Sequence, residues 1–381
     1  MLLKLSVVTL LPFLIGATAQ DPGQFANDRY GYPRYEAAYL RNFFYTGGEY
    51  AFNLAANGTV FQNQMYVEQL TPVTGVTRPH PLVFLPGGGS TSTTWLNTPD
   101  NRTGWASYFL QQGYAVHLVD YPSTGRSQRL PETANVVPTT VEAAERFFTA
   151  PELTPETYPQ ARLHNQWPGT GARGDSIFDG WYASQEPVPS NFTAEEVAMR
   201  KSMCDLLKQI GPSFLIGHSY GGSFLLTTAD ECPDLVQGLF GVEPAATPFT
   251  PLARRPYGLT STPLLYDPPL TAPSDLQQFP VLGENSLGNN SCILQAAPAR
   301  KLANISKVPF AFYTAQASIH ITYDHCLAAY LWQSGVNLDW ILLQDRNITG
   351  NGHFSFLERN NLQIAKEVVE PFLDLYRGAR L

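Results

Sequence analysis

The chain of 381 residues is rich in apolar side chains, with 44% hydrophobic and 12% aromatic residues, so its composition excludes intrinsic disorder. Charged residues amount to only 15% and the formal net charge is −8, so we expect no nucleic-acid partner and no electrostatic attraction to an anionic membrane. This length suits two or three domains, or one large α/β domain.

The first 19 residues have the three parts of a secretory signal peptide. Lys4 supplies the charged start, residues 5–15 form the apolar run, and Ala17-Thr18-Ala19 is a small-residue cleavage site. A mature chain that begins near Gln20 has 23 basic and 32 acidic residues and a net charge of −9. Because no later run approaches the roughly 18 apolar residues of a membrane helix, we expect a secreted, extracellular protein without a transmembrane segment.

Two further patterns fit an extracellular location. Six N-x-[ST] sequons offer glycosylation sites, at Asn57, Asn101, Asn191, Asn289, Asn304 and Asn347. The four cysteines are Cys204, Cys232, Cys292 and Cys326, and none belongs to a C-x-x-C pair. An even number of cysteines in an oxidising compartment favours two disulfides over metal ligation or a reactive thiol.

An Asn-Gly pair marks the first predicted elements after the signal segment. Residues 50–55 and 59–69 have the character of strands on either side of Asn57-Gly58, which is a strong hairpin signal. From there, strand-like runs alternate with helical segments, which is typical of a mainly parallel sheet covered by helices on both faces. In chain order we expect strand 80–85, helix 105–112, strand 114–120, helix 194–210, strand 213–217, helix 222–230, strand 236–242, strand 308–315, helix 323–333, strand 338–343 and helix 361–376.

Two long segments interrupt this alternation. Residues 126–192 are rich in Pro and Gly, and residues 244–291 contain nine prolines. The first segment also has many aromatic side chains, among them Phe147, Phe148, Tyr158, Trp167, Phe178, Trp181 and Tyr182. Because long loops within a compact domain are usually functional, we predict that residues 126–192 form a cap over the carboxyl edge of the sheet, where open α/β sheets bind ligands. The alternative is a surface excursion without a role in binding.

The sequence Gly217-His218-Ser219-Tyr220-Gly221 matches the G-x-S-x-G pattern of a nucleophilic serine. It directly follows the apolar run 213–216 and directly precedes a predicted helix. Its glycines allow the tight strand-to-helix turn that exposes the serine hydroxyl, and the helix N-terminus stabilises developing negative charge. Ser219 is therefore the predicted nucleophile, and the alternative is a purely structural turn.

A serine hydroxyl needs a general base, and we predict that His353 is this base. It follows Gly350-Asn351-Gly352 in a loop between the last strand and the last helix, which returns it to the edge that carries Ser219. His320 and His325 also follow a predicted strand, so they are competing candidates or substrate-contacting residues. We assign the other four histidines to packing or surface positions: His80, His117, His164 and His218.

A glycine-rich loop, Pro86-Gly87-Gly88-Gly89, follows the third predicted strand, where such a loop supplies part of an oxyanion hole. Together with the hairpin, the serine turn, the late histidine and the two interrupted segments, it resembles the α/β-hydrolase superfamily over nearly the whole mature chain. More narrowly, Gly241-Val242-Glu243-Pro244 is similar to secreted serine esterases that place a glutamate acid after the sixth strand. The resemblance implies an α/β-hydrolase fold and an oxyanion hole formed by the amides of Gly88 and Tyr220. Many lipases and esterases have histidine where this chain has Pro86.

Glu243 is the predicted acid, and Asp324 is its competitor. Many α/β-hydrolases place the acid after the strand predicted at 308–315, but no carboxylate follows that strand before Asp324. Glu243 ends the preceding strand, 24 residues beyond Ser219, where its carboxylate is expected at the catalytic edge within reach of His353. A structural role for Glu243 is the third reading.

For the cysteines we predict the pairs Cys292–Cys326 and Cys204–Cys232, out of three connectivities. Cys292 and Cys326 are expected near the starts of helices at one edge of the sheet. Cys204 and Cys232 are expected in helices that consecutive crossovers bring together.

These residues predict a secreted serine hydrolase that cleaves a carboxylic ester through an acyl-enzyme. The net charge and the cap residues Trp167 and Trp181 favour a small neutral or apolar ester as substrate. We expect no cofactor and no metal; residues 169–174 match G-x-G-x-x-G but follow no strand, so they do not predict a dinucleotide site. The alternatives are a non-catalytic secreted binding protein on the same fold, and a peptidase, acyltransferase, cyclase or lyase that uses the same residues.

Overall fold

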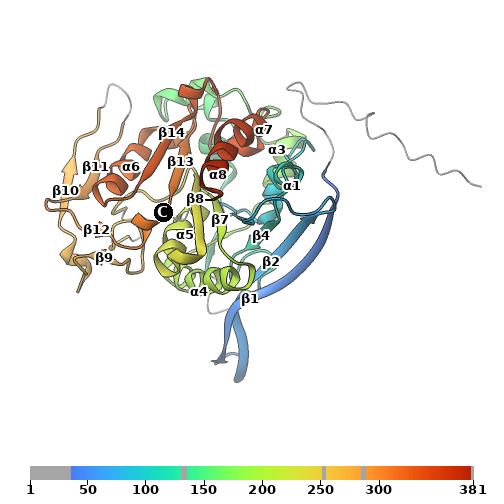
Figure 1. Ribbon diagram of the computed structural model, residues 1–381. Coiled ribbons are helices and arrows are strands. Elements are labelled where there is room, and N and C mark those ends of the chain that lie inside the picture. Colours follow the sequence, from blue (N-terminus) through green and yellow to red (C-terminus); the bar gives the residue numbers. More distant parts are fainter. Residues whose placement is uncertain (1–35, 130–134, 251–254, 285–288, 379–381) are drawn as a thin grey trace, which may run out of the picture.

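The computed structural model describes residues 36–129, 135–250, 255–284 and 289–378 (Figure 1). The predicted signal peptide and its cleavage site lie outside these residues. Among the helices that are described, none combines the length and the apolar character needed to cross a lipid bilayer.

One sheet of eight strands, in the order β1-β2-β4-β3-β7-β8-β13-β14, dominates the described part of the chain. Its strands are β1 Tyr39–Asn53, β2 Gly58–Pro72, β3 Leu82–Leu85, β4 Val116–Asp120, β7 Ser213–His218, β8 Val236–Val242, β13 Phe310–Thr314 and β14 Leu338–Leu342. β2 runs antiparallel to both β1 and β4, and all other neighbours are parallel. The mainly parallel sheet predicted from the alternating elements is therefore confirmed.

The hairpin of β1 and β2 is longer than the sequence predicted. Its strands pair from Tyr39 opposite Pro72 to Asn53 opposite Gly58, so residues 54–57 make the turn. Asn57 closes this turn with a φ of 47°, in the left-handed region that asparagine tolerates better than most residues. In Figure 1 the blue hairpin extends beyond the rest of the fold.

Helices cover both faces of the sheet, as the sequence predicted. On one face lie α4 Phe192–Ile210, α5 Tyr220–Glu231 and α6 Asp324–Gln333, and on the other lie α1 Trp105–Gln111, α7 Asn361–Ile364 and α8 Glu370–Tyr376 (Figure 1). The short strand β3 is buried throughout: Leu82 and Phe84 belong to the core with α1, α7 and α8, whereas Val83 and Leu85 belong to the core with α4, α5 and α6. A strand covered on both faces needs an apolar residue at every position.

The C-terminal segment differs from the single helix predicted over residues 361–376. A wider π-helical turn, Ala365–Val369, separates α7 from α8. Pro371 lies in the first turn of α8. Its ring nitrogen carries no hydrogen, so the regular i→i−4 bond is missing at this point and the helix is not uniform.

The two interrupted segments contain more regular structure than the sequence predicted. The described part of residues 126–192 contains the α-helices α2 Val141–Ala144 and α3 Ser176–Ala183, and the strand β5 Val136–Val137 paired with β6 Val188–Pro189. It also contains a π-helical turn, Glu145–Thr149, and the 3₁₀ turns Pro151–Leu153 and Pro159–Leu163. Beyond β8, the residues that the structure describes form two more strand pairs, β9 Tyr266–Asp267 with β12 Lys301–Leu302 and β10 Gln278–Val281 with β11 Cys292–Gln295. The strands of these pairs and α2 have two to four residues each, which is too short for a hydrophobic period to be recognised, whereas the eight-residue α3 was missed within a segment rich in Pro and Gly.

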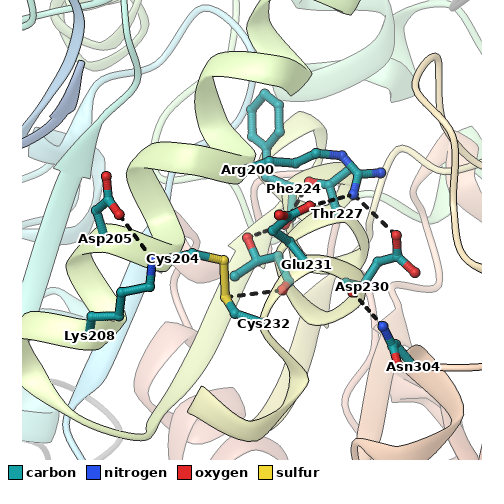
Figure 2. Close-up of a disulfide and its surroundings, with 11 residues drawn as sticks. Arg200, Cys204, Asp205, Lys208, Phe224, Thr227, Asp230, Glu231, Cys232 and Asn304 are labelled. Atoms are coloured by element: carbon teal, nitrogen blue, oxygen red, sulfur yellow. Dashed lines mark hydrogen bonds and ion pairs between the residues drawn. A yellow bond between two sulfur atoms is a disulfide. The ribbon is translucent and has the colours of Figure 1, made fainter. Parts of the chain in front are cut away.

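Two disulfides join the cysteines in the pairs expected from the sequence, Cys204 with Cys232 and Cys292 with Cys326. The first links α4 to the end of α5, as Figure 2 shows. The expectation for Cys292 was wrong in one respect, because it lies in β11 and not near the start of a helix. β11 packs against α6, which contains Cys326, and this brings the two sulfur atoms together.

Candidate active site

Ser219 lies at a strained turn between β7 and α5. Its φ is 48°, a conformation that residues with a side chain rarely adopt. Backbone hydrogen bonds hold it there: its N–H donates to the carbonyl of Val242 over 3.0 Å, and its carbonyl accepts from the N–H groups of Gly222 at 2.9 Å and Ala245 at 2.7 Å. The serine is therefore fixed at the carboxyl end of β7.

The glycines of the G-x-S-x-G pattern have a steric cause. A Cβ atom on Gly221 would lie 2.5 Å from the carbonyl oxygen of Pro86, and one on Gly217 would lie 2.7 Å from the carbonyl oxygen of Gly221. Both distances are too short for a real contact. The strand, the helix and the loop after β3 can approach one another only because these positions have no side chain.

His353 and Glu243 form a buried hydrogen-bonded pair. Nδ1 of His353 donates to Oε2 of Glu243 over 2.7 Å, and the two side chains are 3% and 0% exposed. Because a carboxylate is the acceptor, Nδ1 holds the proton and Nε2 is left as the basic nitrogen. Glu243 also accepts hydrogen bonds from the N–H of Ala315 and the hydroxyl of Ser318, each at 2.7 Å.

Burial acts on both members of this pair. It raises the pKa of Glu243 above its usual value, an effect that the charge of His320 opposes and that of Asp324 increases. Burial also lowers the pKa of His353 well below its usual value, and the neighbouring rings of His320 and His218 lower it further. A low pKa keeps His353 uncharged and able to accept a proton.

Gly88 and Tyr220 lie beside the serine. A Cβ atom on Gly88 would lie 3.4 Å from Cβ of Tyr220, and one on Gly87 would lie 3.3 Å from Cβ of Ser219. Tyr220 is the first residue of α5, so its N–H has no carbonyl partner within the helix. The hydroxyl of Tyr121 donates to the carbonyl of Pro86 and holds the glycine-rich loop in place.

Ser219 and His353 share one small cavity. Its lining comprises Gly88, Thr139, Ala144, Phe148, Trp181, Tyr182, Gln185, His218, Ser219, His353 and Phe354. The free volume is about 20 Å³, which is room for about one water molecule. Of the two tryptophans predicted to contact substrate, Trp181 lines this cavity and Trp167 does not. Trp167 packs against Trp181 with ring centroids 5.5 Å apart and lies behind it.

Several lining residues were not singled out from the sequence. Phe148 stacks on the imidazole of His353 with ring centroids 5.2 Å apart, and Phe354 packs edge-on against the same ring at 5.5 Å. The abundance of aromatic residues in the 126–192 segment was the available signal for Phe148 and Tyr182. His218, which we assigned to packing or the surface, is buried with Nε2 3.1 Å from the carbonyl oxygen of His353 and also lines the cavity.

The competing histidines and the competing acid have other hydrogen-bond partners. Asp324 is paired with His320, with Oδ1 2.9 Å from Nδ1, and so it is not the partner of His353. Nε2 of His325 lies 3.1 Å from the carbonyl oxygen of Asn290. Of the remaining histidines, His117 is buried in β4, His80 contacts the carbonyl of Pro212, and His164 lies between two carboxylates.

Two groups of described residues have metal-ligating atoms within 4.8 Å of one another. The first group comprises Glu243, His320 and His353. In this group Oε2 of Glu243 is already hydrogen-bonded to Nδ1 of His353. In the second, both cysteines, Cys292 and Cys326, are joined in a disulfide. Neither group is therefore arranged as a ready metal site.

Comparisons with known proteins show the family and the fold. The sequence profile of the Alpha/beta hydrolase family matches residues 82–367. The chain is 37% identical over 343 residues to a protein of Fungal sp. (strain ATCC 74256) named "Probable secreted lipase phiG", covering 88% of this chain and 91% of that protein. Among solved structures, a novel bacterial esterase has the same fold, with a TM-score of 0.58 and 18% identity over 91% of this chain and 98% of its own.

Proposed function

The chain belongs to the alpha/beta hydrolase family, and from this premise we propose that it is a secreted serine hydrolase that cleaves carboxylic esters. The observation that supports the proposal most strongly is the arrangement at the carboxyl edge of the sheet. A serine held at a strained turn shares a cavity with His353, and Nδ1 of that histidine is hydrogen-bonded to a buried glutamate.

In the proposed reaction, Oγ of Ser219 attacks the ester carbonyl carbon while Nε2 of His353 takes the hydroxyl proton. The N–H groups of Gly88 and Tyr220 donate to the oxyanion of the tetrahedral intermediate. The intermediate collapses as the C–O bond to the alcohol breaks, and His353 returns the proton to the departing alkoxide. Water then attacks the acyl-enzyme by the same route, which releases the acid and restores the serine.

The proposed substrate is a small neutral or apolar ester. Aromatic rings form much of the cavity wall, namely Phe148, Trp181, Tyr182 and Phe354. Three of these belong to residues 126–192, which supports the proposal that this segment is a cap over the active site. A free volume of about 20 Å³ holds no ester, so we expect the segment to move when substrate enters.

Secretion is part of the proposal. It is supported by the signal-like first 19 residues, by the two disulfides and by the relative whose name describes it as secreted. Secretion would also give the six sequons access to the glycosylation machinery.

The test is covalent labelling with a fluorophosphonate, combined with hydrolysis of a panel of esters of graded acyl length. We expect the wild type to be labelled at Ser219 and to hydrolyse neutral esters faster than matched anionic ones. The variant Ser219→Ala should be unlabelled and should lose several orders of magnitude in rate. The exposed Ser274→Ala is the matched control and should behave like wild type.

Three outcomes would contradict the proposal in different ways. A wild-type protein that takes no label would be a binding protein without turnover. Labelling of Ser219 without release of acid would indicate transfer or non-hydrolytic chemistry, which product analysis would identify. Retained hydrolysis in Ser219→Ala would reject this serine as the nucleophile.

A further inference from the structure

A second histidine–carboxylate pair lies directly against the first. Nδ1 of His320 is 2.9 Å from Oδ1 of Asp324. The imidazole of His320 stacks on that of His353, with ring centroids 4.5 Å apart and an angle of 13° between the ring planes. His320 is 3% exposed and Asp324 is 1% exposed, so water screens this pair only weakly.

The hydrogen bonds that orient this second pair come from residues other than His353. β13 is followed by a 3₁₀ turn, Ile319–Thr322, that contains His320, and Asp324 begins α6. The second oxygen of Asp324 accepts from the hydroxyl of Thr314 at 2.7 Å, and that hydroxyl oxygen accepts from Nε1 of Trp340 at 2.9 Å. The carboxylate is therefore oriented by residues of β13 and β14.

Ser318 joins the two pairs. Its hydroxyl donates to Oε2 of Glu243 over 2.7 Å. Oγ of Ser318 in turn accepts a hydrogen bond from the backbone N–H of His320 at 3.2 Å. In addition, one nitrogen of His320, one oxygen of Glu243 and one nitrogen of His353 all lie within 4.8 Å of one another. The charge of His320 therefore acts on both members of the first pair at close range.

The cluster contains two buried carboxylates, Glu243 and Asp324, whose charges repel each other. The other ionisable groups that face His320 or its neighbour Tyr323 are Tyr323 itself, Tyr158, His218, His353 and Arg255. Arg255 acts on Tyr323 and donates its hydrogen bonds to Ser223 and to the carbonyls of Thr247 and Ala245. Buried carboxylates need a compensating positive charge close by, and His320 is the group placed to supply it.

We propose that His320 is protonated in the resting protein and is a positioning residue for the proposed serine hydrolase. Its imidazolium, held by Asp324, keeps Glu243 ionised and keeps His353 in the neutral form that accepts the serine proton. This inference rests on the proposed function, because it concerns the acid and the base of that reaction.

The proposal gives a definite sign for the pH dependence. A positive His320 repels a second proton on His353, and it favours the negative form of Glu243. Both effects let the site become active at a lower pH. The acid limb of kcat/KM should therefore move to higher pH when the charge of His320 is removed.

The first experiment measures kcat/KM against pH for the wild type, His320→Gln, Asp324→Asn and His80→Gln. For His320→Gln we expect the acid limb to move up by about one pH unit or more. Asp324→Asn should move it in the same direction but less, because a buried His320 without its counter-charge loses its proton. The half-buried His80 lies outside the site and is the matched histidine control, whose limb should stay in place. A uniform loss of rate in His320→Gln without a shift of the limb would overturn the proposal.

The second experiment needs no turnover. In Ser219→Ala labelled with ¹⁵N-histidine, the ring nitrogen shifts report the charge of each imidazole, and the signals of His320 are those lost in His320→Gln. We expect His320 to keep its proton to a pH above the ordinary histidine value of about 6.5. A His320 that titrates at or below this value would overturn the proposal. If the wild type hydrolyses no ester, the proposed function fails, and this experiment still decides the charge of His320.

Discussion

Glu243 has surroundings that suit a charged carboxylate. Its two oxygens accept three hydrogen bonds, from the N–H of Ala315, the hydroxyl of Ser318 and Nδ1 of His353. These donors satisfy a negative group that is fully buried and that burial alone would neutralise. A side chain of the same shape that also donates hydrogen bonds does not fit this set of partners.

Glu243→Gln should therefore reduce the rate of acylation by about a thousandfold or more. The glutamine amide can accept at its oxygen only, so its NH₂ group would face a donor, and His353 would be driven to the tautomer with its proton on Nε2. The pre-steady-state burst with an activated ester measures this rate, and thermal unfolding checks that the variant is folded. A nearly normal burst in Glu243→Gln, together with an inactive Asp324→Asn, would reassign the acid to Asp324.

The asparagines of the sequons differ in exposure and in hydrogen bonding. Nδ2 of Asn304 donates to the carbonyl of Asp230 over 2.8 Å in the half-buried region drawn in Figure 2, whereas Asn57 is exposed at the hairpin turn. A glycan on Asn304 would have to displace that hydrogen bond. In protein secreted from a eukaryotic host, we expect glycopeptide mass spectrometry to find Asn57 occupied and Asn304 unoccupied. Full occupancy of Asn304 would contradict this expectation and would show that the hydrogen bond does not prevent glycosylation.

At the residue scale, the sequence identified the groups whose positions follow from the order of elements. Ser219 and Glu243 come directly after β7 and β8, and His353 lies in the loop between β14 and α7, so the order of the parallel strands brings all three to one edge. The partner of Asp324 was not predictable in this way, because a 3₁₀ turn and a helix start had to be recognised between β13 and α6. Trp167 and Trp181 have the same residue type, and only the packing distinguishes the one that reaches the cavity.

At the scale of elements, long apolar runs were predictable and short elements were not. β8 was predicted with its observed bounds, because seven consecutive residues are buried between two helical layers. The 126–192 segment was predicted to be irregular, yet it contains α2, α3 and the β5–β6 pair. These elements are stabilised by distant contacts such as that of Ser190 with the carbonyl of Asn135, which no local pattern reveals.

The buried His164 connects residues 126–192 to the loop that contains His353. Nδ1 of His164 is 2.7 Å from Oε2 of Glu152, and Nε2 is 2.7 Å from Oε1 of Glu358. Glu358 in turn accepts from the N–H of Gly352 at 3.0 Å. Burial lowers the pKa of His164, but the two carboxylates outweigh burial and raise it to about 9.

The contacts of His164 with Glu152 and Glu358 should weaken at high pH. The folded-state pKa of His164 lies above the unfolded value of about 6.5, so its contribution to stability is complete below that pH and is lost as the pH rises through about 9. At pH 6 we expect the free energy of unfolding of His164→Gln to be about 1–3 kcal/mol lower than that of wild type, and we expect this difference to shrink by pH 10. Unfolding followed at both pH values measures it. A difference that stays constant would mean that His164 contributes by packing alone.

At the scale of the whole molecule, the two disulfides lie on the same side of the sheet but hold different parts of it. Cys204–Cys232 links α4 and α5, where Arg200 also bridges to Asp230 over 3.1 Å (Figure 2). Cys292–Cys326 ties the β10–β11 pair to α6, two residues beyond Asp324. The first supports the helical layer, and the second also supports the element that orients His320.

Removing each bridge should therefore have the same effect on stability and different effects on activity. The bridges span 28 and 34 residues, for which the loss of chain entropy predicts about 3–4 kcal/mol each. We expect Cys204→Ala/Cys232→Ala and Cys292→Ala/Cys326→Ala to unfold at clearly lower temperature than wild type. The first pair should keep its kcat/KM at 25 °C, whereas the second should lose activity because Asp324 is less well held. Equal activity in both double variants would show that α6 keeps its place without the bridge, and an unreduced peptide map that joins Cys232 to Cys292 would contradict both pairings.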